Sequence, residues 1–147
     1  MQIITNTTNI VDADGLILGR MASIVAKSLL NGNRVIILNA EKAIISGKKK
    51  SKVVETKEFL KVGSPRKGPF HYRRPDRILR KTVKGMLPHR QPKGKNAYKR
   101  LKVFLGIPHE FESTQMITIK EAKASKLRGP YLTLGDLAKE IGWNEVK

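Results

Sequence analysis

The sequence predicts a mixed α/β fold, because a short strand, an amphipathic helix and a buried strand follow one another near its start. Residues 9–12 are typical of a strand that runs into a turn, and apolar residues recur at helical spacing over 16–30. Gly32 stands where a glycine commonly ends a helix. The run RVIIL at 34–38 is apolar after its first residue, as in a parallel strand buried on both faces. These segments predict a βαβ unit with a right-handed crossover.

The middle of the chain predicts two helices joined by a loop. Ala43–Ile45 is compatible with either a strand or a helical turn, and its pattern leaves both open. Residues 48–61 predict a helix with a thin apolar face, and the prolines and glycines of 63–71 predict a loop. Pro75 suits a first helical turn, and Gly85 and Pro88 are expected to end that helix. Its predicted core-facing stripe comprises Ile78, Leu79, Thr82, Val83 and Met86.

The last third of the chain predicts a helix, a strand and a terminal helix. After a polar loop at 89–95, which we expect its binding partner to order, Asn96 is predicted to cap a helix that ends at Gly106. Its predicted inward positions are Ala97, Tyr98, Leu101, Phe104 and Leu105. Residues 115–119 predict a strand, and 121–130 an irregular connection. Thr133 and Asp136 have capping-box spacing and predict a final helix that ends at Gly142.

Positive charge is concentrated in one part of the chain. The 147 residues, which we take as one domain (1–147), hold 30 Lys and Arg against 12 Asp and Glu, a net charge of +18. The block Gly47–Lys102 holds 20 of the cations and 3 of the carboxylates, a net of +17, which leaves 10 and 9, or +1, for the remainder. A block this basic repels itself and needs a polyanion beside it.

This basic block predicts an RNA-binding surface. Lys and Arg bind phosphates and release counterions, and the flat guanidinium and aromatic groups among them can stack on bases. RNA is favoured over DNA because the chain has no helix-turn-helix, finger or zipper pattern. The candidate RNA-binding residues are Lys48, Lys49, Lys50, Lys52, Arg66, Lys67, His71, Tyr72, Arg73, Arg74, Arg77, Arg80, Lys81, Lys84, His89, Arg90, Lys93, Lys95, Lys99, Arg100 and Lys102.

Two rival functions receive less support. An RNA-processing or nucleotide-dependent enzyme would use the glycine turn DGLILGR at 14–20, but Gly15 and Gly19 match neither phosphate-loop pattern. We interpret them as a turn glycine and a close-packing glycine, and we predict no catalytic residues. A basic amphipathic helix could also lie on an anionic membrane, but the apolar face here lacks the usual bulky Trp and Phe residues.

Composition excludes several kinds of site. The chain has no cysteine, hence no disulfide, thiol nucleophile or thiolate zinc site, which agrees with a cytoplasmic protein. Its three histidines lack metal-binding spacing, so we expect neither metal nor cofactor. No apolar run approaches the roughly 20 residues of a membrane span, and residues 1–10 do not resemble a signal peptide. We expect the protein to bind neither a membrane nor a small-molecule substrate. We also do not expect it to form a homo-oligomer.

Several motifs resemble one known family. VKGMLP at 83–88, GK at 94–95 and LKVFLGIPH at 101–109, preceded by RRPDRILRKT, are similar to the universal large-subunit ribosomal protein family L-thirteen. VDADGLILGRMAS at 11–23 and NAEKAIISG at 39–47 match its amino-terminal half, and the resemblance covers about 9–143. GPFHYRRPDRI and LGDLAKEIGW resemble the archaeal and eukaryotic branch. The eukaryotic member, thirteen-a, has a long carboxy-terminal extension that is absent here, so we expect an archaeal source.

The resemblance implies a three-layer α/β/α core around a parallel sheet of about four strands. It also implies a structural role in the large ribosomal subunit, with rRNA and neighbouring ribosomal proteins as partners and with early joining in assembly. The family motif carries over onto Arg73, Arg74, Arg77, Arg80, Lys84, Gly85, Met86, Pro88, Gly94, Lys95, Lys102, Gly106 and His109. From the resemblance we expect these cations to touch rRNA, Gly85 to allow close approach and Met86 to lie in the core.

Overall fold

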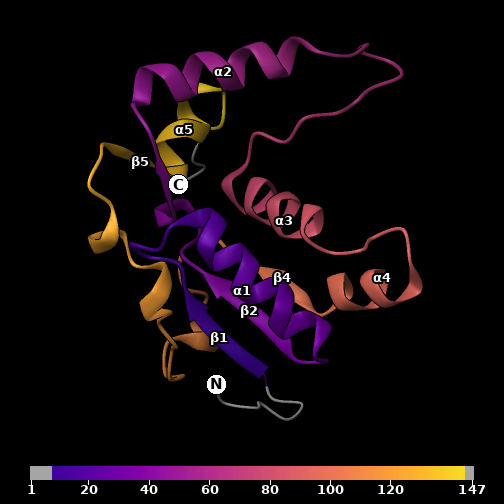
Figure 1. The fold of residues 1–147 in the computed structure, drawn as a ribbon, viewed down its shortest axis with the longest axis vertical. Helices are drawn as coiled ribbons and strands as arrows, with labels where there is room; N and C mark the ends of the chain where they lie inside the picture. Colours follow the sequence, from indigo (N-terminus) through magenta and orange to yellow (C-terminus); the bar gives the residue numbers. More distant parts are fainter. Residues whose placement is uncertain (1–7, 145–147) are drawn as a thin grey trace.

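A parallel three-stranded sheet organises the fold (Figure 1). The computed structural model describes residues 8–144, so most of the 1–10 segment considered above lies outside the described residues. The strand order is β1-β2-β4, with Thr8 opposite Arg34 and Val35 opposite Leu101. The strands and the helix of the βαβ unit are β1 (Thr8–Asp12), α1 (Leu18–Leu30), β2 (Arg34–Leu38) and β4 (Leu101–Val103). The predicted α/β class and βαβ unit are confirmed.

The third strand occupies a segment that we predicted as helix, so the predicted helix over 96–105 is wrong. The helix α4 (Pro92–Lys99) starts five residues earlier, with Pro92 in its first turn and Gln91 rather than Asn96 as its N-cap, and part of the predicted loop at 89–95 is helical. Residues 101–103 then extend along β2. Leu101 is buried, Lys102 exposed and Val103 half-buried, which is the alternation of a strand.

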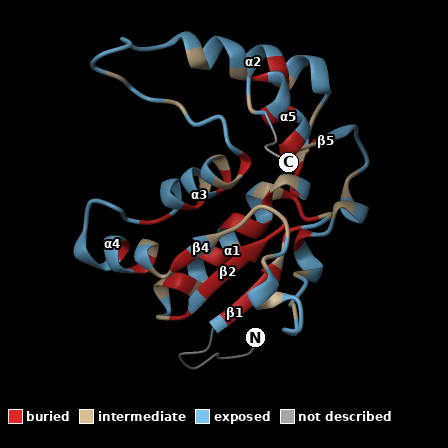
Figure 2. Cartoon of the chain, turned by 180° about the vertical axis from the view of Figure 1, so that it is seen from behind, coloured by how far each residue is buried: buried red, intermediate tan, exposed pale blue. Residues whose placement is uncertain are grey.

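Helices cover one face of the sheet, and an irregular segment covers the other. The core beneath α1, α3 (Pro75–Gly85) and α4 includes Val35, Ile37 and Leu101 (Figure 2). On the opposite face, Ile10, Ile36 and Leu38 pack against side chains from 104–116, a segment that contains the 3-10 turn η2 (His109–Phe111). The third layer is therefore a loop with one helical turn.

The predicted strand at 115–119 is reduced to a single bridge at the edge of β1. The Ile117 amide donates to the Ile10 carbonyl at 2.7 Å, and the Ile117 carbonyl accepts from the Asp12 amide at 3.2 Å. This bridge stands where a fourth strand was expected. The segment continues through two further 3-10 turns, η3 (Lys120–Ala122) and η4 (Ala124–Lys126).

A second small sheet and a short helix close the carboxyl end of the parallel strands. Ala43–Ile45, left open above, contributes to the strand β3 (Ile44–Ser46), which pairs antiparallel with β5 (Tyr131–Thr133). The helix α5 (Leu134–Glu140) follows at once, and the Thr133 hydroxyl accepts from the Asp136 amide at 3.1 Å, which confirms the predicted cap. The 3-10 turn η1 (Ala40–Lys42) packs against α5.

The helix α2 (Lys49–Lys61) and the loop that follows it project from this end of the molecule (Figure 1). Val53 is the only fully buried residue of α2, which confirms the predicted thin apolar face. The helix packs against α5, and the Lys49 ammonium lies 3.1 Å from the Glu140 carboxylate. We call residues 49–74 the arm.

Three expectations about single residues are wrong. Met86 is 43% exposed, and its neighbour Leu87, at 4%, occupies the core position, because α3 ends at Gly85 and the chain turns there. A Cβ on Gly85 or on Gly19 would have nothing within 4 Å, so neither glycine allows a close approach. The close approach is at Gly94, where a Cβ would fall on the Pro88 carbonyl. Gly15, with φ +68°, is the predicted turn glycine.

Candidate nucleic-acid interface

The helix α3 exposes its cations to solvent because its apolar residues pack into the core. Pro75, Leu79 and Val83 are buried at spacings of four residues, which places them on one face. Arg77, Arg80, Lys81 and Lys84 are related by spacings of three or four residues, apart from the adjacent pair Arg80 and Lys81, and form a row on the exposed side. The helix thus docks by one face and offers four positive charges on another.

Aromatic rings lie between these cations. The Arg80 guanidinium carbon lies 4.7 Å from the centre of the Tyr98 ring, and the Lys84 ammonium lies 5.9 Å from the same ring. Lys81 approaches Phe59 of the arm at 5.0 Å, and Arg77 approaches Tyr72 at 6.0 Å. Such cation–π contacts restrict the long side chains without neutralising their charge. They also link α3 to α4 and to the arm.

The helix α4 extends the same surface. Gly94 and Ala97 are buried, and their small size lets α4 lie close to α1 and to the chain at Pro88. The exposed cations of this part are His89 (if protonated), Arg90, Lys93, Lys95 and Lys99. The second half of the predicted loop at 89–95 is helix, and Gly94 packs it against the chain at Pro88.

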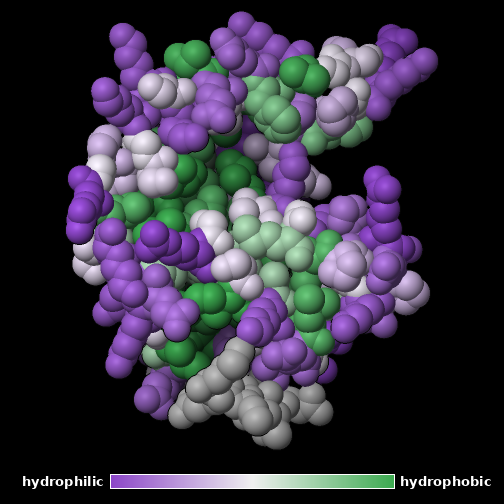
Figure 3. Space-filling view, viewed as in Figure 1, coloured by the Kyte–Doolittle hydropathy of each residue, from purple (hydrophilic) through white to green (hydrophobic). Residues whose placement is uncertain are grey.

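Further cations lie beside the start of the arm and at the turn within it. Lys48, Lys49 and Lys50 lie at the start of α2, and all three are exposed. Arg66 and Lys67 lie at the tip of a tight turn, which two backbone hydrogen bonds between Ser64 and Gly68 close at 3.0 and 2.8 Å. Figure 3 shows hydrophilic residues over the arm and over the α3–α4 side, with a notch between the two.

All but three of the candidate residues are exposed, and the three exceptions, Lys52, His71 and Arg100, are half-buried. Arg100 donates from a terminal nitrogen to the Leu29 carbonyl at 2.7 Å, so it closes the end of α1. His71 lies 2.9 Å from the Val62 carbonyl through Nε2 and packs edge-on against Phe59. These two side chains hold the fold and contribute less to the outer surface.

Two candidates are separated from the α3 row. Lys102 lies opposite Ile36 in the sheet and so projects from the face that α3 and α4 do not cover. The Arg73 guanidinium lies beside Gly142, at the carboxyl end of α5. Sequence reasoning missed Phe59 and Phe70, although aromatic residues within so basic a block were a visible signal.

Few carboxylates neutralise this surface. Among residues 8–144, the cations of the block pair with acids at three places only: Lys49 with Glu140, Lys52 with Glu55, and Arg74 with Asp76. The remaining cations, apart from Arg100 at the end of α1, face solvent or aromatic rings. An unneutralised row of this kind attracts polyanions, and its binding energy comes largely from counterion release.

Comparison with known proteins decides the family. The family model described as "Ribosomal protein L13" matches residues 6–110. The chain belongs to the ribosomal protein L13 family. It is 45% identical over 134 residues to a large ribosomal subunit protein uL13 from Methanococcoides burtonii, covering 90% of this chain and 96% of the relative. The matches also include uL13 from Methanosarcina barkeri, at 46% over 90% of the chain and 96% of the relative, and from Tetrahymena thermophila, at 42% over 92% and 72%.

Membership of the L13 family identifies the chain as a large-subunit ribosomal protein, not an enzyme. The glycine turn that an enzyme would use is engaged in contacts within the chain. Leu16 is fully buried. The Ile17 amide donates to the Ala122 carbonyl at 2.7 Å, and the Gly15 carbonyl accepts from the Ala124 amide at 2.9 Å. No helix within residues 8–144 has the length and apolarity to cross a membrane.

Proposed function

We propose that this chain binds folded large-subunit rRNA through its basic lobe, residues 47–102, and acts as a structural constituent of the subunit. The observation that supports this most directly is the exposed row Arg77, Arg80, Lys81 and Lys84, which has no carboxylate partner among the described residues. The α/β core, close to neutral overall, positions this row. Its charges would neutralise phosphates where RNA segments pack closely.

Recognition would depend on RNA shape more than on base sequence. The cations come from α2, α3 and α4, so their phosphate contacts are spread over separate elements rather than along one groove-reading helix. The aromatic contacts of Arg80 and Lys84 reduce the side-chain freedom that binding would otherwise remove.

An early role in assembly follows from the same proposal. A protein that bridges RNA segments would be most useful before later proteins join, and its nearly neutral remainder would face neighbouring large-subunit proteins. We expect a cytoplasmic protein that works as a single copy within each subunit.

The first test is sedimentation of a cell lysate, followed by an antibody against this protein. We expect the protein to travel with the large subunit and to stay there through a high-salt wash. A protein that remains at the top of the gradient, or that leaves at modest salt, would refute a structural role.

The second test assigns the surface. Arg77→Glu and Arg80→Glu should each weaken binding of large-subunit rRNA and lower the slope of log affinity against log salt by about 1. Lys126→Glu, an exposed cation outside the lobe, is the matched control and should change the slope much less. Unchanged binding by both arginine variants would move the contact away from α3.

A further inference from the structure

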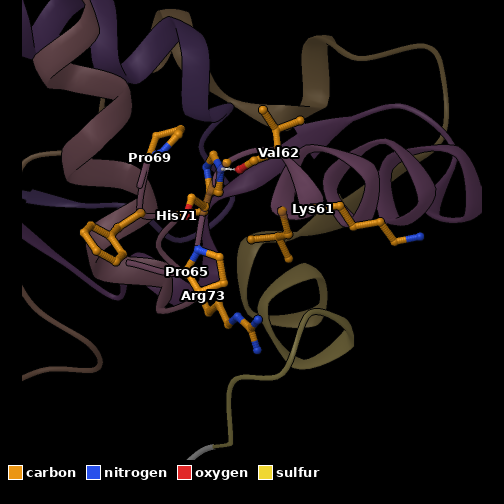
Figure 4. A pocket seen from close by; sticks show the side chains of 10 residues that line it. Lys61, Val62, Pro65, Pro69, His71 and Arg73 are labelled. Carbon is orange, nitrogen blue, oxygen red and sulfur yellow. Dashed lines mark hydrogen bonds between the residues drawn. The ribbon is translucent and has the colours of Figure 1, made fainter. Parts of the chain in front are cut away.

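An open hollow in the arm is lined by apolar and polar groups and has cations at its rim. It encloses about 350 Å³ and is lined by residues 60–65, 69–71 and 73. This volume lies within the roughly 300–1,000 Å³ of small-ligand sites. Leu60, Pro65, Pro69 and Phe70 supply apolar surface, while Figure 4 shows Lys61 and Arg73 extending outward on two sides. Such a lining suits a flat apolar group attached to an anionic chain.

The arm holds this shape through its own contacts. The backbone bonds between Ser64 and Gly68 close its turn, and His71 joins the returning chain to the Val62 carbonyl, as Figure 4 shows. The Phe59 ring, 4.3 Å from the His71 ring between centroids, packs behind that contact. A preformed site loses less conformational entropy when it binds a ligand.

One side chain at this hollow is unusually exposed. Phe70 is 72% exposed, the highest value among the large apolar residues that the structure describes. It stands four residues after Arg66 and three after Lys67, which lie at the tip of the turn. An exposed aromatic ring beside cations is how proteins bind single-stranded nucleic acid, because the ring stacks on a base while the cations hold phosphates.

We propose that Phe70 and the hollow beside it form a stacking site for an unpaired base of RNA, with Arg66 and Lys67 on the adjoining phosphates. This inference rests on the proposed function and adds to it a contact with bases, at a place distinct from the α3 row. The arm would thereby bind a single-stranded stretch of RNA, while α3 and α4 lie against folded RNA.

The test compares a short single-stranded oligoadenylate with an abasic strand of the same length, each binding to the full chain. The wild type should bind the oligoadenylate more tightly, and Phe70→Ala should lose about five- to 100-fold of that affinity, with no change for the abasic strand. Phe70→Trp should retain the preference. Val54→Ala removes an equally apolar surface residue, 50% exposed, from α2 outside the hollow, and it should behave as wild type.

A spectroscopic measurement reports stacking directly. The chain has one tryptophan, Trp143, so Phe70→Trp in a Trp143→Phe background carries a single indole at the hollow. Oligoadenylate should quench its fluorescence, whereas the abasic strand and a Val54→Trp control should show no such quenching. Equal binding of the two strands by the wild type, or an unchanged affinity of Phe70→Ala, would overturn the stacking site and leave a protein neighbour as the occupant of the hollow. Failure of the proposed function can be told apart from failure of the stacking site, because in that case the wild type would not bind rRNA at all.

Discussion

Replacing Gly94 by alanine tests the packing of α4 against the chain at Pro88, which follows α3. A Cβ at this position would fall on the Pro88 carbonyl and lie 2.9 Å from the His89 nitrogen. Carbon atoms in contact normally lie about 3.5–4.0 Å apart, so α4 would have to move by on the order of 1 Å. The obstacle is backbone, which cannot rotate away as a flexible side chain would.

The expected cost follows from this overlap. Overpacking of a well-packed interior costs about 1–3 kcal/mol, and the higher helix propensity of alanine offsets only part of it. Gly85→Ala is the matched control, because Gly85 also lies in a helix and a Cβ there meets nothing within 4 Å. That variant should be neutral or more stable by about 0.4–1 kcal/mol.

Urea and thermal denaturation followed by circular dichroism would measure the difference. We expect Gly94→Ala to be about 1–3 kcal/mol less stable than Gly85→Ala, because the propensity gain is common to both, and for a chain of this size this is a difference in Tm of roughly 3–10 °C. Two variants of equal stability would refute the close approach of α4 to Pro88.

Two further predictions separate core from surface. Leu87→Ala should lower stability by about 2–5 kcal/mol in urea denaturation, while Met86→Ala, at a half-exposed position, should cost less than about 1 kcal/mol; similar losses would mean that Met86 shares the core. Arg100→Met removes the hydrogen bond to the Leu29 carbonyl, so it should cost about 1–3 kcal/mol and leave the salt dependence of rRNA binding unchanged. An altered salt slope would instead place Arg100 on the RNA surface.

The elements that could be predicted from the sequence are those whose signals are local. The helix ending at Gly32 and the buried strand at 34–38 depend on spacings within a few residues, and so does the Thr133 cap. The segment after α4 was different, because Leu101 and Leu105 fit a helical stripe while Leu101 and Val103 fit a strand. Pairing with β2 decides between the two, and that partner lies more than 60 residues away.

The candidate surface was predictable to a similar extent. A cation-rich block is visible in composition, and most of its residues are indeed exposed. Which cations contact other parts of the chain depends on distant partners: Arg100 is half-buried and meets Leu29, 71 residues earlier in the chain, and the exposed Arg73 lies beside Gly142. No spacing rule identifies such pairs. Met86 and Leu87 show the same limit within one turn, since the end of α3 changes which of two neighbours faces the core.

The concentration of positive charge in the lobe also affects which substitutions the protein can tolerate. The lobe is attached to the sheet through a few small or aliphatic residues, among them Leu79, Val83, Leu87 and Ala97. Its cations take almost no part in that attachment, because exposed charges contribute little to stability. Binding strength can therefore change through α3 and the arm without loss of the fold, whereas one added methyl group at Gly94 would disturb both. Gly94, which lies between the exposed Lys93 and Lys95, is therefore expected to tolerate substitution less well than these two lysines.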